Sequence, residues 1–164
     1  MRVVMLTAAD VRRYRDLMLE AYAQAPDAFT STPQERAAQP ESWWIGRIAN
    51  PAGWTAAVGA FDGDELVGAV ALEFSAKPKT RHKALLIGMY VAPAARGQGI
   101  GRRLMQAIET RFNNVQRYEL FTGHLSSKNL ALYEKLGYRE FSRKTQSEKV
   151  VLIRMEKKLE ERYG

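Results

Sequence analysis

Three glycines separated by single residues form the part of this sequence best suited to chemistry: Gly97, Gly99 and Gly101. The apolar run 84–91 before them predicts a buried strand, and apolar residues at helical spacing after them predict a helix. Glycine allows a ligand to approach closely and permits positive φ, and the first N–H groups of a helix attract an anion. We therefore predict a phosphate-binding turn, around which three arginines add positive charge: Arg96, Arg102 and Arg103.

The two common nucleotide-binding motifs fit this turn poorly. A P-loop has Gly-Lys-Ser/Thr at the start of the helix, where this sequence has Arg102 and Arg103. The dinucleotide fingerprint G-x-G-x-x-G/A matches Gly97 and Gly99 but requires glycine or alanine in place of Arg102. Glu119 lies near the distance expected for a ribose-binding acid, but in the middle of a predicted strand. An ordinary strand-to-helix turn without a ligand is the alternative.

The turn resembles the central motif R/Q-x-x-G-x-G/A of the GCN5-related N-acetyltransferase (GNAT) superfamily, and a second stretch, Leu132 to Tyr138, resembles the family pattern L-Y-E-K-x-G-F/Y. The resemblance implies that acetyl-CoA is the co-substrate and that the amides of the turn hold the pyrophosphate of coenzyme A. With Asn129, whose case is given below, the residues that we expect to bind the coenzyme are Met89, Tyr90, Val91, Arg96, Gly97, Gln98, Gly99, Ile100, Gly101, Arg102, Asn129 and Tyr133.

The elements expected along the chain match the GNAT order almost from end to end. The resemblance implies an α/β (α+β) fold of three layers, α/β/α, with a mixed, mostly antiparallel sheet of about seven strands in a single domain, 1–164. Capping-box spacing at Thr7 and at Thr32 marks two helix starts. We expect strands at 3–7, 54–61, 65–75, 84–92, 117–123, 138–144 and 150–157, and helices at 9–25, from 32, at 40–49, 101–113 and 127–136.

Tyr133 is the candidate catalytic acid. The resemblance places this tyrosine near the coenzyme sulfur, where a thiolate leaves after an amine attacks the thioester, and a phenol within reach can protonate it. A core tyrosine with a satisfied hydroxyl is the alternative. Many family members have asparagine seven residues earlier, where this chain has Ser126. Asn129 shares a helix face with Tyr133 and is the other candidate for the coenzyme arm, whereas Ser126 or Ser127 alternatively caps the helix.

The strand before the turn has its own implied role. In the family it splays from its neighbour, and its freed backbone groups pair with the pantetheine arm; here Met89 to Val91 occupy that position. Buried N–H and C=O groups need partners, so a missing strand partner favours a ligand. Pro93 cannot donate a hydrogen bond, which is consistent with strand pairing that ends there.

The general base is the least defined part of the site. An amine acceptor must lose a proton, and several family members place glutamate or histidine on the strand before the turn. Leu85 and Ile87 hold the corresponding positions and are apolar. We single out Glu73, on the adjacent strand, as the catalytic base. A water chain and three residues with ordinary structural alternatives remain as other candidates: Tyr90, His82 and His124.

The composition of the chain disfavours several classes of protein, namely metal-binding, membrane and nucleic-acid-binding proteins. The chain has 164 residues, 46% apolar and 26% charged, which is ordinary globular composition. It has no cysteine and two histidines, so the sequence implies no metal site. No apolar run is long enough to span a membrane and none reads as a signal peptide, so we expect no membrane partner and a cytoplasmic protein. The net charge of +7 suits an anionic coenzyme, and no nucleic-acid-binding motif accompanies it, so no nucleic acid is expected.

The sequence favours an acetyl-CoA-dependent N-acetyltransferase that transfers an acetyl group directly to a primary amine of a small molecule, amino acid or peptide. The alternative is a non-catalytic acyl-CoA-binding or regulatory module on the same fold, which the apolar base positions favour and Tyr133 disfavours. The region 29–50 is expected to cover the acceptor, with one of Trp43 and Trp44 in the core and the other exposed or lining a cleft. Homodimers are common among such proteins, but no residue indicates one.

Overall fold

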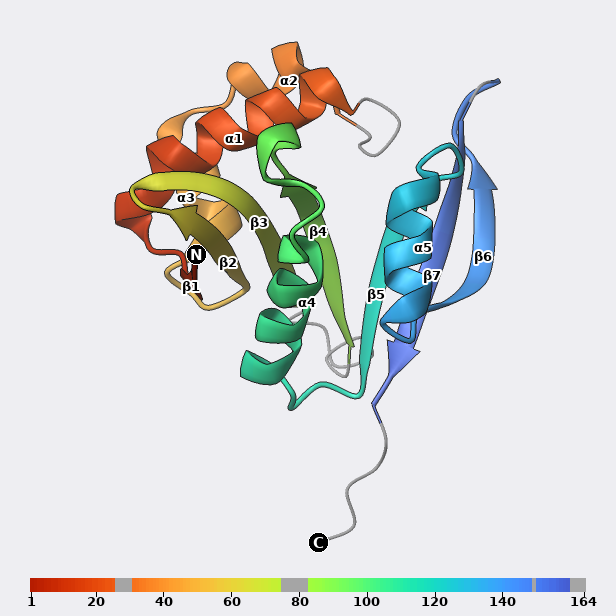
Figure 1. Ribbon diagram of the computed structural model, residues 1–164. Helices are drawn as coiled ribbons and strands as arrows, with labels where there is room; N and C mark the ends of the chain where they lie inside the picture. The colour runs from red at the N-terminus through yellow and green to blue at the C-terminus, as the bar shows by residue number, and fades with distance from the viewer. Residues whose placement is uncertain (26–30, 75–82, 149, 160–164) are drawn as a thin grey trace, which may run out of the picture.

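The computed structural model describes residues 1–25, 31–74, 83–148 and 150–159, and within them seven strands form one sheet in the order β1-β2-β3-β4-β5-β7-β6 (Figure 1). Neighbouring strands pair antiparallel except β4 and β5, which are parallel. The mixed, mostly antiparallel sheet is therefore confirmed. The strands are β1 Arg2–Met5, β2 Thr55–Asp62, β3 Glu65–Phe74, β4 Lys83–Val91, β5 Arg117–Gly123, β6 Arg139–Thr145 and β7 Val151–Lys158.

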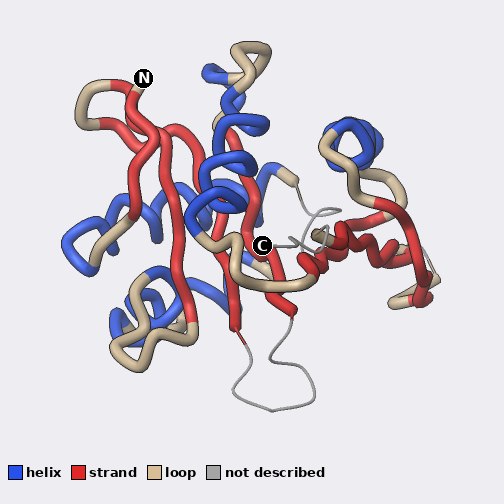
Figure 2. Tube along the Cα trace, turned by 90° about the horizontal axis from the view of Figure 1, so that it is seen from below, coloured by secondary structure: helices blue, strands red, loops and turns tan. Residues whose placement is uncertain are grey.

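Helices cover both faces of the sheet, which confirms the three-layer arrangement (Figures 1 and 2). One apolar cluster joins α1 and α3 to one face, and a second joins α4 and α5 to the other. The helices are α1 Val11–Gln24, α2 Pro33–Ala37, α3 Glu41–Ile48, α4 Ile100–Arg111 and α5 Ser127–Lys135, with short 3-10 turns at Ala8–Asp10 and Pro93–Ala95.

Local signals explain where these helices begin and end. At the first predicted cap, the Asp10 carboxylate accepts a hydrogen bond from the Thr7 amide at 2.8 Å. This closes a 3-10 turn, so α1 begins two residues later than expected. At the second, the Thr32 hydroxyl accepts from the Glu35 amide at 3.1 Å and begins α2. Gly137, at φ +97°, ends α5 as predicted.

The predicted splay of β4 is confirmed. Its parallel pairing with β5 is confined to Lys83–Leu85, opposite Arg117–Glu119. Farther along, the register with β3 shifts around Gly88, which has φ +62°, so Gly88 and Met89 stand together opposite one residue of β3. This bulge bends the strand away from β5, and the two strands diverge toward the end where α4 begins (Figure 1).

An ion-pair network holds the closed end of this divergence. The Glu119 carboxylate is 7% exposed and lies 3.1 Å from Lys83 Nζ and 3.2 Å from a terminal nitrogen of Arg117. Arg117 also pairs with Glu156 of β7 at 3.2 Å. Because Glu119 joins β4 to β5 where they still pair, its role is to fix the origin of the splay rather than to bind a ribose.

Candidate active site

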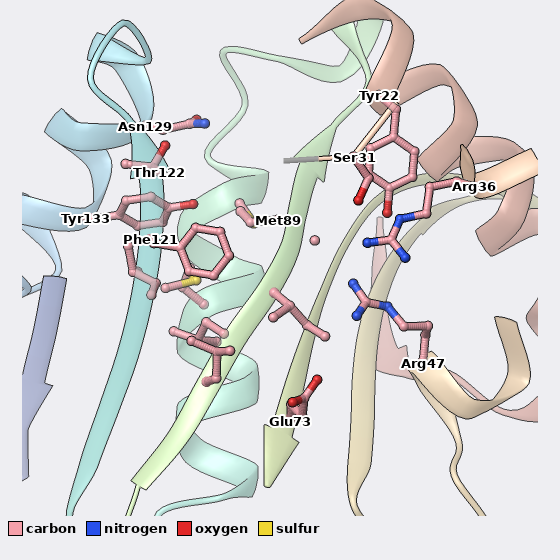
Figure 3. Close-up of a pocket in the computed structure, with 16 residues that line it drawn as sticks. Tyr22, Ser31, Arg36, Arg47, Glu73, Met89, Phe121, Thr122, Asn129 and Tyr133 are labelled. Carbon is pink, nitrogen blue, oxygen red and sulfur yellow. The ribbon is translucent and has the colours of Figure 1, made fainter. Parts of the chain in front are cut away.

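A cleft of about 190 Å³ lies between the diverging strands (Figure 3). The α5 and β5 wall carries the predicted catalytic tyrosine, and the opposite wall is built by the N-terminal helices. The lining includes Phe121, Thr122, Asn129 and Tyr133 on the first wall, Leu85, Ile87, Gly88 and Met89 of β4, Tyr22, Ser31, Arg36 and Arg47 on the second wall, and Glu73 of β3.

Two of the three glycines in the turn need their conformational freedom. Gly97 and Gly99 have φ of +79° and +74°, and a Cβ added to either would meet nothing within 4 Å. Among the described residues no side chain caps α4, whose N-cap is Gly99. Its first N–H groups therefore have no helical partner, and the backbone at this end is open to an anionic ligand.

Gly101 is used differently. A Cβ there would lie 2.9 Å from the Met89 side chain and 3.1 Å from that of Leu132. This glycine lets the first turn of α4 pack closely between β4 and α5. Its neighbour Ile100 is buried in the core, so only the backbone of these two residues can face a ligand, whereas Gln98 and Arg102 have exposed side chains.

Arg96 braces the end of β4. Its Nε donates a hydrogen bond to the Val91 carbonyl at 3.0 Å, and its guanidinium carbon lies 5.6 Å from the centre of the Tyr90 ring. The Val91 carbonyl is thus already used, and the remaining backbone groups of Met89 and Val91 are the candidates for a ligand. The Tyr90 ring packs into the core with α1, and burial raises the pKa of its hydroxyl, which disfavours Tyr90 as a base.

Tyr133 is 5% exposed, and its hydroxyl points into the cleft (Figure 3). Burial raises the pKa of this phenol well above its ordinary value, because a phenolate would lose its solvation. The group therefore keeps its proton at neutral pH, as a proton donor must. Asn129, one helical turn earlier, lies on the same wall near the mouth of the cleft.

The candidate base lies on the other side of β4. Glu73 is exposed, stands opposite Leu85 in the strand register, and directs its carboxylate into the cleft on the side of Arg47 (Figure 3). Leu85 and Ile87 line the cleft, as expected from the sequence. His124 is a structural residue, because its Nδ1 accepts a hydrogen bond from the Val151 amide at 2.9 Å. His82 lies outside the described residues.

Several cleft residues were missed by sequence reasoning. Thr122 is 2% exposed, and its hydroxyl has no hydrogen-bond partner among the described residues. Thr122 follows Tyr118 and Leu120 at the two-residue spacing of one strand face, and this was the available signal. Arg47 follows Trp43 by four residues and so shares its helix face. Nothing in the local sequence indicated Tyr22 or Arg36.

The paired tryptophans divide as predicted. Trp44 is fully buried in the core beside Tyr14, with ring centres 6.1 Å apart. Trp43 is half-buried and carries guanidinium groups of Arg36 and Arg47, whose central carbons lie 4.5 and 5.2 Å from its ring centre. The less buried member of the pair thus supports two arginines of the second wall of the cleft.

The fold, the open glycine turn and the splayed strand define an acetyl-transfer protein of the GNAT type. The model of the acetyltransferase (GNAT) family matches residues 14–138, and the chain belongs to this family. A search of curated proteins finds no match.

Solved structures of the same fold cover nearly the whole chain. A ribosomal-protein-alanine N-acetyltransferase from Brucella melitensis is 22% identical, with TM-score 0.75 and coverage of 97% of this chain and 100% of its own. The putative acetyltransferase yncA from Salmonella typhimurium, solved with its cofactor acetyl-CoA, is 17% identical, with TM-score 0.77 and coverage of 100% of this chain and 96% of its own. PaiA N-acetyltransferase from Thermoplasma acidophilum, in complex with coenzyme A, is 19% identical, with TM-score 0.73 and coverage of 97% of this chain and 100% of its own.

The described residues contain no cluster of three or more histidine, cysteine, aspartate or glutamate residues that could hold a metal ion. Within the same ranges, no helix combines the length and the apolar character that crossing a membrane requires.

Proposed function

We propose that this chain is an acetyl-CoA-dependent N-acetyltransferase that transfers an acetyl group directly to a primary amine. One observation carries the proposal: the hydroxyl of the buried Tyr133 points into the cleft between β4 and β5, and these two strands diverge toward the end where α4 begins. The fold shared with structures solved with acetyl-CoA and with coenzyme A supports the identity of the acyl donor.

The residues present fit such a donor. The open amides from Gly97 to Arg102 suit its pyrophosphate, because backbone N–H groups at a helix start bind phosphate well. The unpaired edge of β4 at Met89 suits the pantetheine arm. Thr122 supplies a buried hydroxyl that lacks a protein partner, and such groups normally find one, so we add it to the coenzyme contacts.

Acetyl-CoA supplies the acetyl group as an activated thioester. Tyr133 donates its proton to the departing sulfur as the C–S bond breaks and the new C–N bond forms. The nitrogen loses its second proton as the neutral amide forms, and this proton restores the Tyr133 phenol through solvent. Glu73 accepts the ammonium proton of the acceptor, through water where it does not reach the nitrogen. Much of the rate comes from holding the amine against the thioester in the cleft between β4 and β5.

The apolar side chains of Leu85 and Ile87 favour one other candidate, a coenzyme-binding module without activity. Acetyl-CoA-dependent thiol release, measured against amines, amino acids, aminoglycosides and peptides, distinguishes the two, with Tyr133→Phe in parallel. Thiol release with one of these acceptors that Tyr133→Phe abolishes supports the enzyme and identifies the class of acceptor. Binding of acetyl-CoA by calorimetry without thiol release from any acceptor would contradict the proposed activity.

A further inference from the structure

Two guanidinium groups face the acceptor side of the cleft. Arg36 comes from α2 and Arg47 from α3, and both rest on the ring of Trp43. In Figure 3 their charged ends project into the cleft toward each other, with Tyr22 beside Arg36. Two positive charges from separate elements are thereby gathered on one wall.

Neither charge is neutralised by the protein in the part of the chain that the structure describes. The ion pairs there involve other cations, and Glu73, the carboxylate in the cleft lining, pairs with neither arginine. The Nε of Arg36 is buried and has no hydrogen-bond partner among the described residues. The two positive charges repel each other, and the buried Nε of Arg36 loses free energy because it has no acceptor. An anion bound between the two guanidinium groups would reduce the repulsion and supply that acceptor.

Arg47 is held beside the point where β4 leaves its neighbour. Its guanidinium lies near the hydroxyl of Tyr14, whose pKa its positive charge lowers against the larger, opposite effect of burial. That hydroxyl oxygen lies 3.3 Å from the position that a Cβ on Gly88 would take. Because Gly88 forms the bulge at which the cleft opens, the guanidinium stands close to the strand edge along which the thioester is proposed to lie.

We propose that the acceptor is an amine that also carries a carboxylate, with the carboxylate bound by Arg36 and Arg47; this rests on the proposed N-acetyltransferase function. The arginine fork matches the two oxygens of a carboxylate. The formal charges of the two arginines and Glu73 sum to +1, so this half of the cleft offers positive charge to the carboxylate of the acceptor and one carboxylate to its ammonium group. The amine then faces Glu73 and the β4 edge, and Leu85 and Ile87 contact the apolar part of the acceptor.

Matched acceptor pairs test the proposal. Acetyl-CoA-dependent thiol release is measured for L-methionine, L-phenylalanine, β-alanine, 4-aminobutanoate and 6-aminohexanoate, each beside its own amide, with O-phosphoethanolamine as a phosphate-bearing amine. We expect at least one acid to exceed its amide in kcat/KM by about 10-fold or more, the effect of a hydrogen bond to a charged group. The acid with the highest kcat/KM in the length series reports the spacing between the arginines and the thioester.

Variants of the two arginines test whether these side chains bind the carboxylate of the acceptor. Arg36→Gln and Arg47→Gln should lower kcat/KM for the acid by about 10-fold to 100-fold, with a much smaller loss for the amide. Arg47→Lys should restore only part of the loss, because lysine keeps the charge but not the fork. Arg13→Gln, which removes an exposed arginine of α1, is the matched control and should change neither. Thermal midpoints show whether each variant is folded.

The possible failures are distinct. Equal use of acids and amides, an equal loss for both in the arginine variants, or preference for O-phosphoethanolamine overturns the carboxylate assignment and leaves the N-acetyltransferase standing. If no acceptor releases thiol, the proposed N-acetyltransferase function fails. Calorimetry then tests separately whether Arg36 and Arg47 bind a carboxylate. Binding of an acid to the protein saturated with coenzyme A, lost in Arg47→Gln, supports it, and absence of binding by every acid overturns it.

Discussion

Replacing Gly99 by alanine separates backbone strain from coenzyme binding. Gly99 has φ +74°, and no protein atom lies within 4 Å of an added Cβ. The variant should therefore fold, at a cost of about 1–2 kcal/mol for an L-residue in the left-handed region. For a chain of this size that corresponds to a thermal midpoint lower by about 2–8 °C. The added methyl group, however, enters the space assigned to the pyrophosphate.

Gly63 provides a matched control. It has φ +60° in the β2–β3 turn, an added Cβ again meets nothing within 4 Å, and it does not line the cleft. Gly63→Ala should lose the same stability and keep its affinity for acetyl-CoA. Gly99→Ala should bind acetyl-CoA about 10-fold to 100-fold more weakly, the equivalent of one lost hydrogen bond to a charged group.

Calorimetric titration with acetyl-CoA and thermal unfolding followed by circular dichroism measure the two effects. Gly99→Gln and Gly99→Glu extend the series at nearly equal size. The glutamate variant should abolish binding, because its negative charge opposes the phosphates, whereas the glutamine variant reports bulk alone. If Gly99→Ala binds acetyl-CoA as tightly as Gly63→Ala does, the glycine turn is not the phosphate site.

Three further expectations follow from buried groups. Tyr133→Phe should lower turnover by about 10²-fold with little change in acetyl-CoA affinity; turnover within about twofold of the unmodified protein would make Tyr133 purely structural. Burial raises the pKa of Tyr14 and of Tyr118 to about 12. Tyrosines in the unfolded chain ionise near pH 10, so between pH 10 and 12 the unfolded chain loses protons that the folded protein keeps. The free energy of unfolding should therefore fall by up to about 3 kcal/mol for each of the two tyrosines over this range. Urea unfolding and phenolate absorbance check this, and an unfolding free energy constant to pH 12 would refute it. Glu119→Gln should lower the free energy of unfolding in urea by about 1.5–3 kcal/mol, because two partly exposed basic side chains lose their shared carboxylate. A loss below about 0.5 kcal/mol, as for a surface pair, would contradict that role.

Much of the predicted fold follows from local patterns. The strand expected at 117–123 has those bounds in the structure, and the capped helix beginning with Pro33 forms as the Thr32 to Glu35 spacing indicated. Tyr133 and Asn129 could be placed on one wall together, because residues four apart share a helix face. Hydrophobic periodicity and caps act over a few residues, so a sequence displays them directly.

Contacts between distant segments had no such signal. His124 was a candidate base until the structure paired its Nδ1 with the Val151 amide. Glu119 looked like a ribose ligand by spacing, but the register of β4 on β5 brings it against Lys83 and Arg117. In both cases the residue type is visible in the sequence, and its role depends on a partner that is far away along the chain.

The sequence by itself determined the strand, glycine turn and helix that make the proposed phosphate site, because glycine spacing and apolar periodicity dictate that local structure. It also determined the position of Tyr133 on its helix. Only the tertiary structure decided which side chains face one another across the cleft. Arg36 and Arg47 meet on Trp43 because α2 and α3 both pack against α1, on the same face of the sheet. That meeting depends on how helices pack against one another, and the periodicity of each helix does not specify which other helix lies beside it.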